Sequence, residues 1–278
     1  MAEEIKTAGG AKVRKDRLES MLRRDWFTHG LIFDDVLVVS NPGTNCLVIN
    51  TGEGLIVIDA ILPCEEAFTA IRDGILAVGW NPEDIRIMLI SHGHFDHCGA
   101  GRWIVEEYHP KTMLSRRDDE FWRDEPAMPQ LEWTLKDFEI SDYIQEGDLI
   151  HLGHTQIHVY ETPGHTPGGL SFVLNVHERG QEYMAALWGG SNPMPDLPNI
   201  LTYLRSLDRF SMLCDEQHVE VALMNHPFLN NALEKMERMK NDPSLPNPFL
   251  LGEHRFREFL LVYRQLCYNR LANLEDKR

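Results

Sequence analysis

The sequence has few of the features that direct a protein to a membrane or an oxidising compartment. Its 278 residues include no run of 18 apolar residues, so no membrane span is expected. It has only five cysteines, and none of them are in CxxC spacing. The basic residues near the N-terminus are not followed by an apolar h-region, so we expect no secretory signal peptide. These features together predict a cytoplasmic protein with reduced thiols.

Positive charge is also scarce. The chain has 27 Lys and Arg against 43 Asp and Glu, a formal net charge of −16. Phosphate binding requires a basic face, so this balance argues against a nucleic-acid partner. The apolar fraction of 43% is ample for a buried core, and the charged fraction of 25% is ordinary. A small-molecule substrate is the expected partner, and the sequence does not determine the oligomeric state.

The order of predicted elements indicates one α/β-type domain. We expect residues 1–24 to be a loosely ordered N-terminal segment and residues 25–278 to form the domain. Strands at 46–49 and 55–58, a helix at 65–78 and a strand at 85–90 make up a first half. Four strands between 149 and 188 and later helices, among them 201–213 and an amphipathic 253–274, make up a second. This repeated order is compatible with two sheets packed face to face and helices outside.

The chemistry is concentrated in residues 91–100, Ser-His-Gly-His-Phe-Asp-His-Cys-Gly-Ala. Four strong metal ligands, His92, His94, Asp96 and His97, lie within six residues after an apolar strand. In extended chain residues i and i+2 face the same way, so His92 and His94 can bind one ion. One short loop cannot surround an ion, so a further ligand must come from a distant segment.

Two other segments supply such ligands. His165 lies in Thr-Pro-Gly-His-Thr-Pro-Gly, and His226 lies in Met-Asn-His-Pro-Phe. Each follows a predicted strand, so both can converge with the cluster on one sheet edge. Five imidazoles and one carboxylate suit Zn²⁺, although imidazole also accepts iron, and manganese is a further alternative. Six ligands divide as three plus three, and three protein ligands leave a coordination position open, as in catalytic zinc sites.

His92-x-His94-x-Asp96-His97, with the later His165 and His226 motifs, resembles the metallo-β-lactamase superfamily. The resemblance extends from about residue 27 to the C-terminus. It implies an α+β fold, the four-layer αβ/βα sandwich of two mixed sheets with helices outside, and a metal pair at the sheet edge. It also implies a supporting role for Asp59, which follows the strand at 55–58.

Within this superfamily, the chain resembles one subclass more than the others. Many members carry an aspartate that bridges the two metals, but residues 187–192 contain no carboxylate, and the nearest is Asp196. Where two zinc β-lactamase subclasses have cysteine, this chain has Ser191, as in the third subclass. That subclass implies His92, His94 and His165 for the first ion. The ligands implied for the second ion are Asp96, His97 and His226.

The implied reaction is zinc-dependent hydrolysis of a small acyl substrate, β-lactamase-like cleavage of an amide or lactam. A metal-bound hydroxide would attack the carbonyl, with Asp96 orienting the hydroxide as the catalytic carboxylate. Ser191 and Asn192 are the expected substrate-binding residues. A cytoplasmic lactonase or a thioesterase of the hydroxyacylglutathione hydrolase type fits the same ligands. An iron-dependent oxidoreductase and a non-catalytic binding protein are further alternatives.

The remaining reactive residues have simpler interpretations. We expect Cys98 to be a small packed residue rather than a nucleophile. His151, His154 and His158 do not share one strand face and are expected to be solvated. His177 is one of several other histidines expected to be surface residues or hydrogen-bonded in the core. The charged, aromatic segment 115–143 is expected to be an insertion of helix and loop that overhangs the site.

Overall fold

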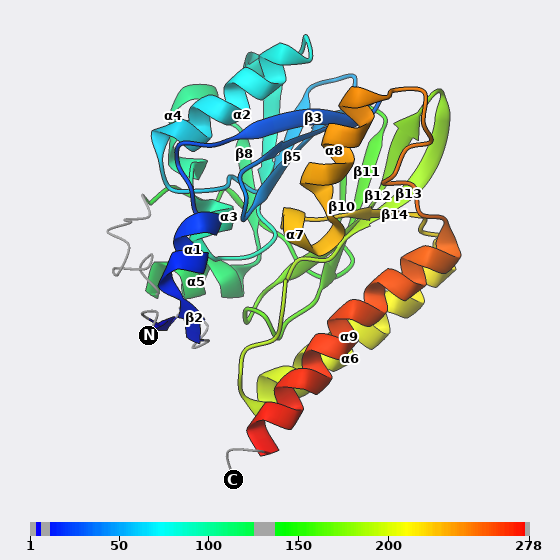
Figure 1. Ribbon diagram of the computed structural model, residues 1–278. Helices are drawn as coiled ribbons and strands as arrows, with labels where there is room; N and C mark the ends of the chain where they lie inside the picture. The colour runs from blue at the N-terminus through cyan, green and yellow to red at the C-terminus, as the bar shows by residue number, and fades with distance from the viewer. Residues whose placement is uncertain (1–3, 7–11, 125–136, 276–278) are drawn as a thin grey trace.

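The computed structural model describes residues 4–6, 12–124 and 137–275 of the chain (Figure 1). The strands are β1 Glu4–Lys6, β2 Lys12–Arg14, β3 Thr28–Phe33, β4 Val36–Ser40, β5 Asn45–Asn50, β6 Leu55–Ile58, β7 Ile85–Leu89, β8 Lys111–Leu114, β9 Asp142–Tyr143, β10 Leu149–Leu152, β11 Thr155–Glu161, β12 Leu170–Glu178, β13 Gln181–Leu187 and β14 Val221–Leu223. The helices are α1 Lys15–Met21, α2 Glu65–Ala77, the 3₁₀ turn η1 Pro82–Asp84, α3 Phe95–Cys98, α4 Gly101–Tyr108, α5 Arg116–Asp124, α6 Leu197–Glu216, α7 Pro227–Asn230, α8 Ala232–Asn241 and α9 Glu253–Glu275. Within these ranges no helix is both long and apolar enough to cross a membrane.

Two mixed sheets form the centre of the fold. The first has seven strands in the order β3-β4-β5-β6-β7-β8-β9, antiparallel from β3 to β6 and parallel from β6 to β9. The second has five strands in the order β10-β11-β12-β13-β14, antiparallel except for the last pair. Its parallel pair, β13 and β14, is joined through α6, as a parallel crossover requires.

Three apolar layers hold the sheets and helices together. The middle layer lies between the sheets and contains residues such as Ile56 of β6 and Phe172 of β12. An outer layer packs α2 and α4 on the seven-stranded sheet, and the opposite outer layer packs α6 and α9 on the five-stranded sheet. Figure 1 shows α6 and α9 side by side on the face of the second sheet. The predicted four-layer sandwich, α+β with helices outside, is therefore confirmed.

The element predictions were accurate where apolar periodicity was strong. The four apolar positions Phe256, Leu260, Tyr263 and Cys267 of α9 are buried against the second sheet, as the predicted stripe requires. α6 is longer than the predicted helix 201–213, because the Asp196 side chain accepts from the backbone N–H of Asn199 and caps an earlier start. β3 was not predicted, because its sequence Thr-His-Gly-Leu-Ile-Phe has no clear alternation of polar and apolar residues.

Two predicted segments are described only in part. In the segment 1–24, α1 buries Leu18, and Leu22 just after it is also buried, so this part packs on the first outer layer. Where the domain begins stays a prediction. In the predicted insertion, α5 and β9 are described, whereas residues 125–136 lie outside the described residues.

A buried tyrosine joins the second sheet to its helical layer and generates the first prediction. The Tyr203 hydroxyl of α6 accepts from Trp188 Nε1 at 2.7 Å and donates to the Gly190 carbonyl at 2.8 Å. Tyr203→Phe leaves both partners buried and unpaired, so we expect a loss of about 1–3 kcal/mol in the free energy of unfolding. Urea unfolding measures it, with Tyr160→Phe as the half-buried control. Equal losses in both variants would contradict the assignment.

Candidate metal centre

The candidate ligands lie in three segments that each begin where a strand ends. Residues 91–98 follow β7 and include α3, His165 follows β11, and His226 follows β14. β7 belongs to the seven-stranded sheet, and β11 and β14 belong to the five-stranded sheet. The ends of both sheets therefore meet at one edge of the sandwich, where the three segments converge.

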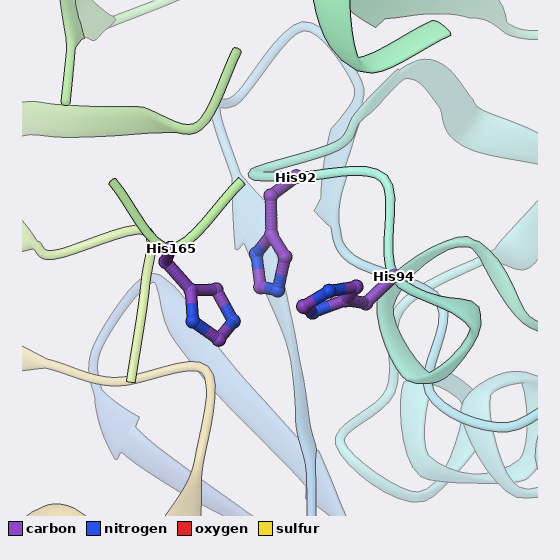
Figure 2. A group of neighbouring side chains, drawn as sticks. All are labelled: His92, His94 and His165. Carbon is purple, nitrogen blue, oxygen red and sulfur yellow. The ribbon is translucent and has the colours of Figure 1, made fainter. Parts of the chain in front are cut away.

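The first group is His92, His94 and His165, whose donor atoms lie within 4.8 Å of one another. Their ring centroids are 4.9 Å apart for His92 and His94, 4.8 Å for His92 and His165, and 4.7 Å for His94 and His165. Figure 2 shows the three rings pointing toward one another, His92 and His94 from the loop after β7 and His165 from a second loop. A common ion between them would account for this arrangement.

The second group is Asp96, His97 and His226, again with donor atoms within 4.8 Å of one another. The rings of His97 and His226 are 4.9 Å apart, and the rings of His97 and His92 are 3.9 Å apart. The two groups are therefore neighbours and share no residue. The structure thus brings all six predicted ligands together, and their metal-binding role stays a prediction.

Three of the ring nitrogens in the site make no hydrogen bond to a described residue. Among the described residues, Nε2 of His92, His94 and His97 is buried and makes no hydrogen bond. A buried, unpaired polar atom is costly, and native proteins seldom leave one without a partner, water or ion. Three such atoms in one site, with an adjacent carboxylate, fit a pair of divalent metal ions.

Backbone carbonyls orient the two histidines of the second sheet. His165 Nδ1 donates to the Asn192 carbonyl at 2.5 Å, and His226 Nδ1 donates to the Gly43 carbonyl at 2.7 Å. Each bond places the imidazole proton on Nδ1 and leaves Nε2 unprotonated. A backbone carbonyl is a usual outer partner of a metal-ligating histidine. Nε2 is therefore the atom through which both residues would bind a metal ion.

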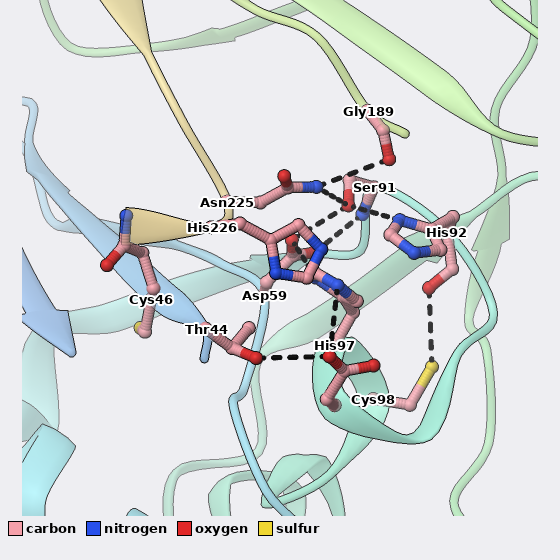
Figure 3. A network of polar contacts seen from close by, with 12 residues as sticks. Thr44, Cys46, Asp59, Ser91, His92, His97, Cys98, Gly189, Asn225 and His226 are labelled. Atoms are coloured by element: carbon pink, nitrogen blue, oxygen red, sulfur yellow. Dashed lines mark hydrogen bonds and ion pairs between the residues drawn. The ribbon is translucent and has the colours of Figure 1, made fainter. Parts of the chain in front are cut away.

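Asp59 organises the other side of the site (Figure 3). Its carboxylate accepts from the Ser91 backbone N–H at 2.7 Å, from Ser91 Oγ at 2.7 Å and from His97 Nδ1 at 2.7 Å. Because Ser91 Oγ donates to Asp59, it can accept from His92 Nδ1 at 3.0 Å and from Asn225 Nδ2 at 3.2 Å. One buried carboxylate thereby sets the orientation of two histidines, and its supporting role in a metal centre stays a prediction.

Burial keeps most of the histidines neutral. It lowers the pKa of His92 and His165 well below the usual range and lowers the pKa of His94 and His226 to about 4, with further lowering from neighbouring imidazoles. Only a neutral imidazole binds a metal. These four residues are therefore ready to bind at physiological pH.

Asp96 and His97 behave differently because each faces an opposite charge. Burial alone would raise the pKa of Asp96, but the attraction of His97, His226 and His94 outweighs it and lowers the pKa to about 2. Burial would lower the pKa of His97, but Asp96 and Asp59 together raise it. Asp96 is therefore a carboxylate at any physiological pH.

The predicted substrate-binding pair lies beside His165. Ser191 is buried, and its Oγ accepts from Asn192 Nδ2 at 3.1 Å. Asn192 Oδ1 accepts from Arg270 of α9 at 2.5 Å, and its backbone carbonyl holds His165. The side chain of Asn192 thus joins the last helix to the site, and substrate contact by either residue stays a prediction.

Cys98 is a packed thiol, as expected. It is fully buried, its Sγ donates to the His92 carbonyl at 3.8 Å, and burial raises the pKa of the thiol well above its usual value. A protonated buried thiol is a poor nucleophile.

Asp118 of α5 is a site residue that the sequence analysis missed. Its Oδ2 accepts from the Gly93 N–H at 2.8 Å and from Thr166 Oγ1 at 2.7 Å, and its Oδ1 accepts from the Gly168 N–H at 2.6 Å. It therefore ties the His92–His94 loop to the His165 loop. Burial raises the pKa of Asp118 to about 6, although these three hydrogen bonds lower it. No signal in the charged run around residue 118 distinguishes this carboxylate from the neighbouring charged residues.

A family model described as the metallo-beta-lactamase superfamily matches residues 41–178. A hydroxyacylglutathione hydrolase of Buchnera aphidicola subsp. Schizaphis graminum is 23% identical over 141 residues, which cover 50% of this chain and 50% of that protein. The alignment thus spans about half of that relative's length.

Two further similarities cover more of the chain. The acyl-coenzyme A thioesterase MBLAC2 of Gallus gallus is 27% identical over 231 residues, 73% of this chain and 81% of that protein. The crystal structure of BJP-1, a subclass B3 metallo-beta-lactamase of Bradyrhizobium japonicum, superposes with a TM-score of 0.79 at 21% identity, covering 94% of this chain and 98% of that one. At this identity the superposition establishes a common fold.

The hydrogen bonds by which Asp118 connects the two ligand loops generate a prediction. Asp118→Asn keeps the shape but places an amide NH₂ against backbone and hydroxyl donors. We expect a loss of about 1–3 kcal/mol in stability and weaker zinc binding, because the two ligand loops separate. Urea unfolding and zinc titration measure these effects. Asp119→Asn is the matched control, since Asp119 bonds Trp122, Arg123 and Tyr143 instead. Equal zinc affinity in the two variants would refute the positioning role.

The lowered pKa values generate a further prediction, for metal-free protein. In the unfolded chain His94 and His226 bind protons near pH 6.5, but in the folded site only near pH 4. Stability should therefore fall as pH drops from 6.5 to 4, by about 2 kcal/mol per histidine at pH 5. Asp118, with its raised pKa, opposes this by about 1 kcal/mol. Urea unfolding in EDTA at pH 7 and pH 5 tests it, and His226→Asn should show a shallower dependence than wild type.

Proposed function

The chain belongs to the metallo-beta-lactamase superfamily, and on that premise we propose that it is a zinc-dependent hydrolase of a small acyl substrate, of the β-lactam or amide type. The observation that carries the proposal is the pair of adjacent three-donor groups that share no residue. Three protein donors per ion leave positions open for water and substrate, as catalytic sites require.

The residues present fit two zinc ions. His92, His94 and His165 would hold one, and the group of Asp96, His97 and His226 would hold the other. Zinc bound there would supply Lewis acidity toward a carbonyl oxygen and would lower the pKa of water to about 7. The neutral imidazoles and the outer hydrogen bonds on Nδ1 are the chain's own contribution to such a centre.

Asp96 would act as an orienting carboxylate. Its Oδ2 accepts from Thr44 Oγ1 at 3.1 Å, which fixes the side chain. Because its pKa is lowered to about 2, it would accept a hydrogen bond from the attacking water but would be a weak proton acceptor. Its proposed task is therefore to aim the water at the substrate carbonyl.

Two aromatic rings flank the ligands and support a substrate with an apolar part. Phe121 of α5 lies 5.7 Å from the ring of His94, and Phe228 of α7 lies 5.1 Å from the ring of His226. Phe228 is 47% exposed, so its ring is available for contact. These rings would receive the acyl portion, while Ser191 and Asn192 are the proposed polar contacts.

A thioesterase is the second candidate. It is supported by the alignment with an acyl-coenzyme A thioesterase over 73% of this chain and by the hydroxyacylglutathione hydrolase match. Against it, residues 187–192 supply no bridging carboxylate, and Asp196 caps α6 instead. A lactonase would use the same two donor groups as the proposed hydrolase. An iron-dependent oxidoreductase would instead contain a single iron ion, so a metal count separates it from both.

We also propose a cytoplasmic location and a small-molecule partner. All five cysteines are free and buried, which is typical of reduced thiols. The net charge of −16 is unfavourable for nucleic acid.

The functional test combines metal counting with a substrate panel. We expect two zinc ions at the centre and turnover of a chromogenic cephalosporin, with acyl-coenzyme A, lactoylglutathione and lactone substrates measured in parallel. His92→Ala should reduce turnover at least about 100-fold, because it removes a zinc ligand. His151→Ala, an exposed histidine of β10, is the matched control. Turnover only of thioesters selects the second candidate, and undiminished turnover by His92→Ala refutes the site.

A further inference from the structure

A second cluster of metal-ligating side chains lies at the opposite end of the sandwich. It contains Asp35 in the β3–β4 turn, His154 in the β10–β11 turn and His177 near the end of β12. β11 runs from His154 toward His165, and β12 runs back from the metal centre to His177. The seven residues of β13 span the same distance, so roughly 20 Å separate the cluster from the candidate centre.

The cluster joins the two sheets. Asp35 belongs to the seven-stranded sheet, while His154 and His177 belong to the five-stranded sheet. Asp35 is buried, with 7% of its side chain exposed, whereas the side chains of His154 and His177 are 46% and 29% exposed. The Asp35 carboxylate is thus on the buried side of the cluster, and the two imidazoles are on the solvent side.

The donor atoms of His154 and Asp35 are at a distance that suits one ion. One donor atom from each residue lies within 4.8 Å of the others. His154 Nε2 is 3.6 Å from Asp35 Oδ2, too long for a hydrogen bond. Two donors on one tetrahedral zinc, each about 2.0–2.2 Å from the metal, are about 3.3–3.5 Å apart. The two rings are perpendicular with centroids 5.0 Å apart, so neither ring stacks on the other.

We propose that Asp35, His154 and His177 form a further metal site for zinc or a similar divalent transition metal, which clamps the two sheets together. Two imidazoles and one carboxylate are a donor set that such ions prefer. The proposal does not depend on the catalytic assignment, because the two sites share no residue and no loop.

Neighbouring groups complete the site. His177 Nδ1 is 2.6 Å from Asp35 Oδ2, while Asp35 Oδ1 accepts from the His177 backbone N–H at 3.0 Å and stays anchored. When Nδ1 binds the ion, its proton moves to Nε2, and the Glu182 carboxylate faces this nitrogen, with Oε2 3.6 Å from Nε2. Asn175 Nδ2 donates to Glu182 at 3.1 Å and holds this carboxylate in place. A slightly closer approach of Glu182 would give His177 the outer hydrogen bond that a ligating histidine usually makes.

The consequence of occupancy is stability rather than catalysis. The Asp34 N–H already donates to the His177 carbonyl at 2.8 Å, so the two sheets are in register at this point. An ion binds the folded arrangement and not the unfolded chain, so it stabilises the protein by an amount that grows with the logarithm of its concentration over the dissociation constant. Zinc should therefore raise the melting temperature beyond the effect of filling the candidate centre.

The test compares two single variants of the full chain, His154→Ala and His151→Ala. His154 is half-exposed, so its removal should not disturb folding, and His151 is an exposed histidine of the same hairpin. Protein stripped with EDTA is titrated with zinc by calorimetry, and the bound metal is counted. We expect wild type and His151→Ala to bind one equivalent more than His154→Ala and to gain more in melting temperature. Loss of this ligand should weaken the additional site at least about tenfold.

The difference between the two variants decides the proposal, whatever number of ions the candidate centre holds. Equal zinc counts and equal melting-temperature gains in His154→Ala and His151→Ala would overturn it and leave Asp35 and His177 as a hydrogen-bonded pair between the sheets. Extra zinc that binds weakly and equally to both variants would also overturn it, as binding at the surface. Cobalt titration gives a second readout, since the additional ion should contribute absorption in the visible range that His154→Ala lacks.

Discussion

The buried carboxylate of Asp59 is the interaction on which the site depends. It lies at the end of β6 with a backbone φ of +63°, an uncommon conformation that the structure maintains through three hydrogen bonds to its side chain. These bonds place Ser91 and His97, and Ser91 in turn orients His92. A single buried side chain therefore ties the residues after β7 to the end of β6 and orients two of the candidate ligands.

A second buried carboxylate, that of Asp118, holds the other side of the site together. Asp118 accepts from Gly93 and from two residues around His165, so a second carboxylate connects loops from the two sheets. Gly93 permits this approach, because a Cβ there would lie 2.6 Å from the Asp118 carbonyl oxygen. The two carboxylates explain how segments far apart in sequence are held as one surface.

Most of the fold and the six candidate ligands could be predicted from the sequence, for identifiable reasons. β7 and α9 have strong apolar patterns, and His92, His94, Asp96 and His97 are too closely spaced for ordinary folding residues. Short elements such as β3 and β8 could not be predicted, because their pairing with neighbours, not their local pattern, makes them strands. Asp118 was missed for a similar reason, since only its partners distinguish it.

The sequence by itself determined which residue types are available and in what order: imidazoles and carboxylates after strands, and apolar faces of the right period. Local spacing fixes these because side-chain direction repeats along a strand or helix. The tertiary structure alone decided which distant groups meet. Asp35 and His177 are 142 positions apart and no sequence pattern links them, yet His177 Nδ1 lies 2.6 Å from Asp35 Oδ2 because two sheets pack face to face. Burial, partner geometry and the resulting pKa values follow from that packing and are not written in any local pattern.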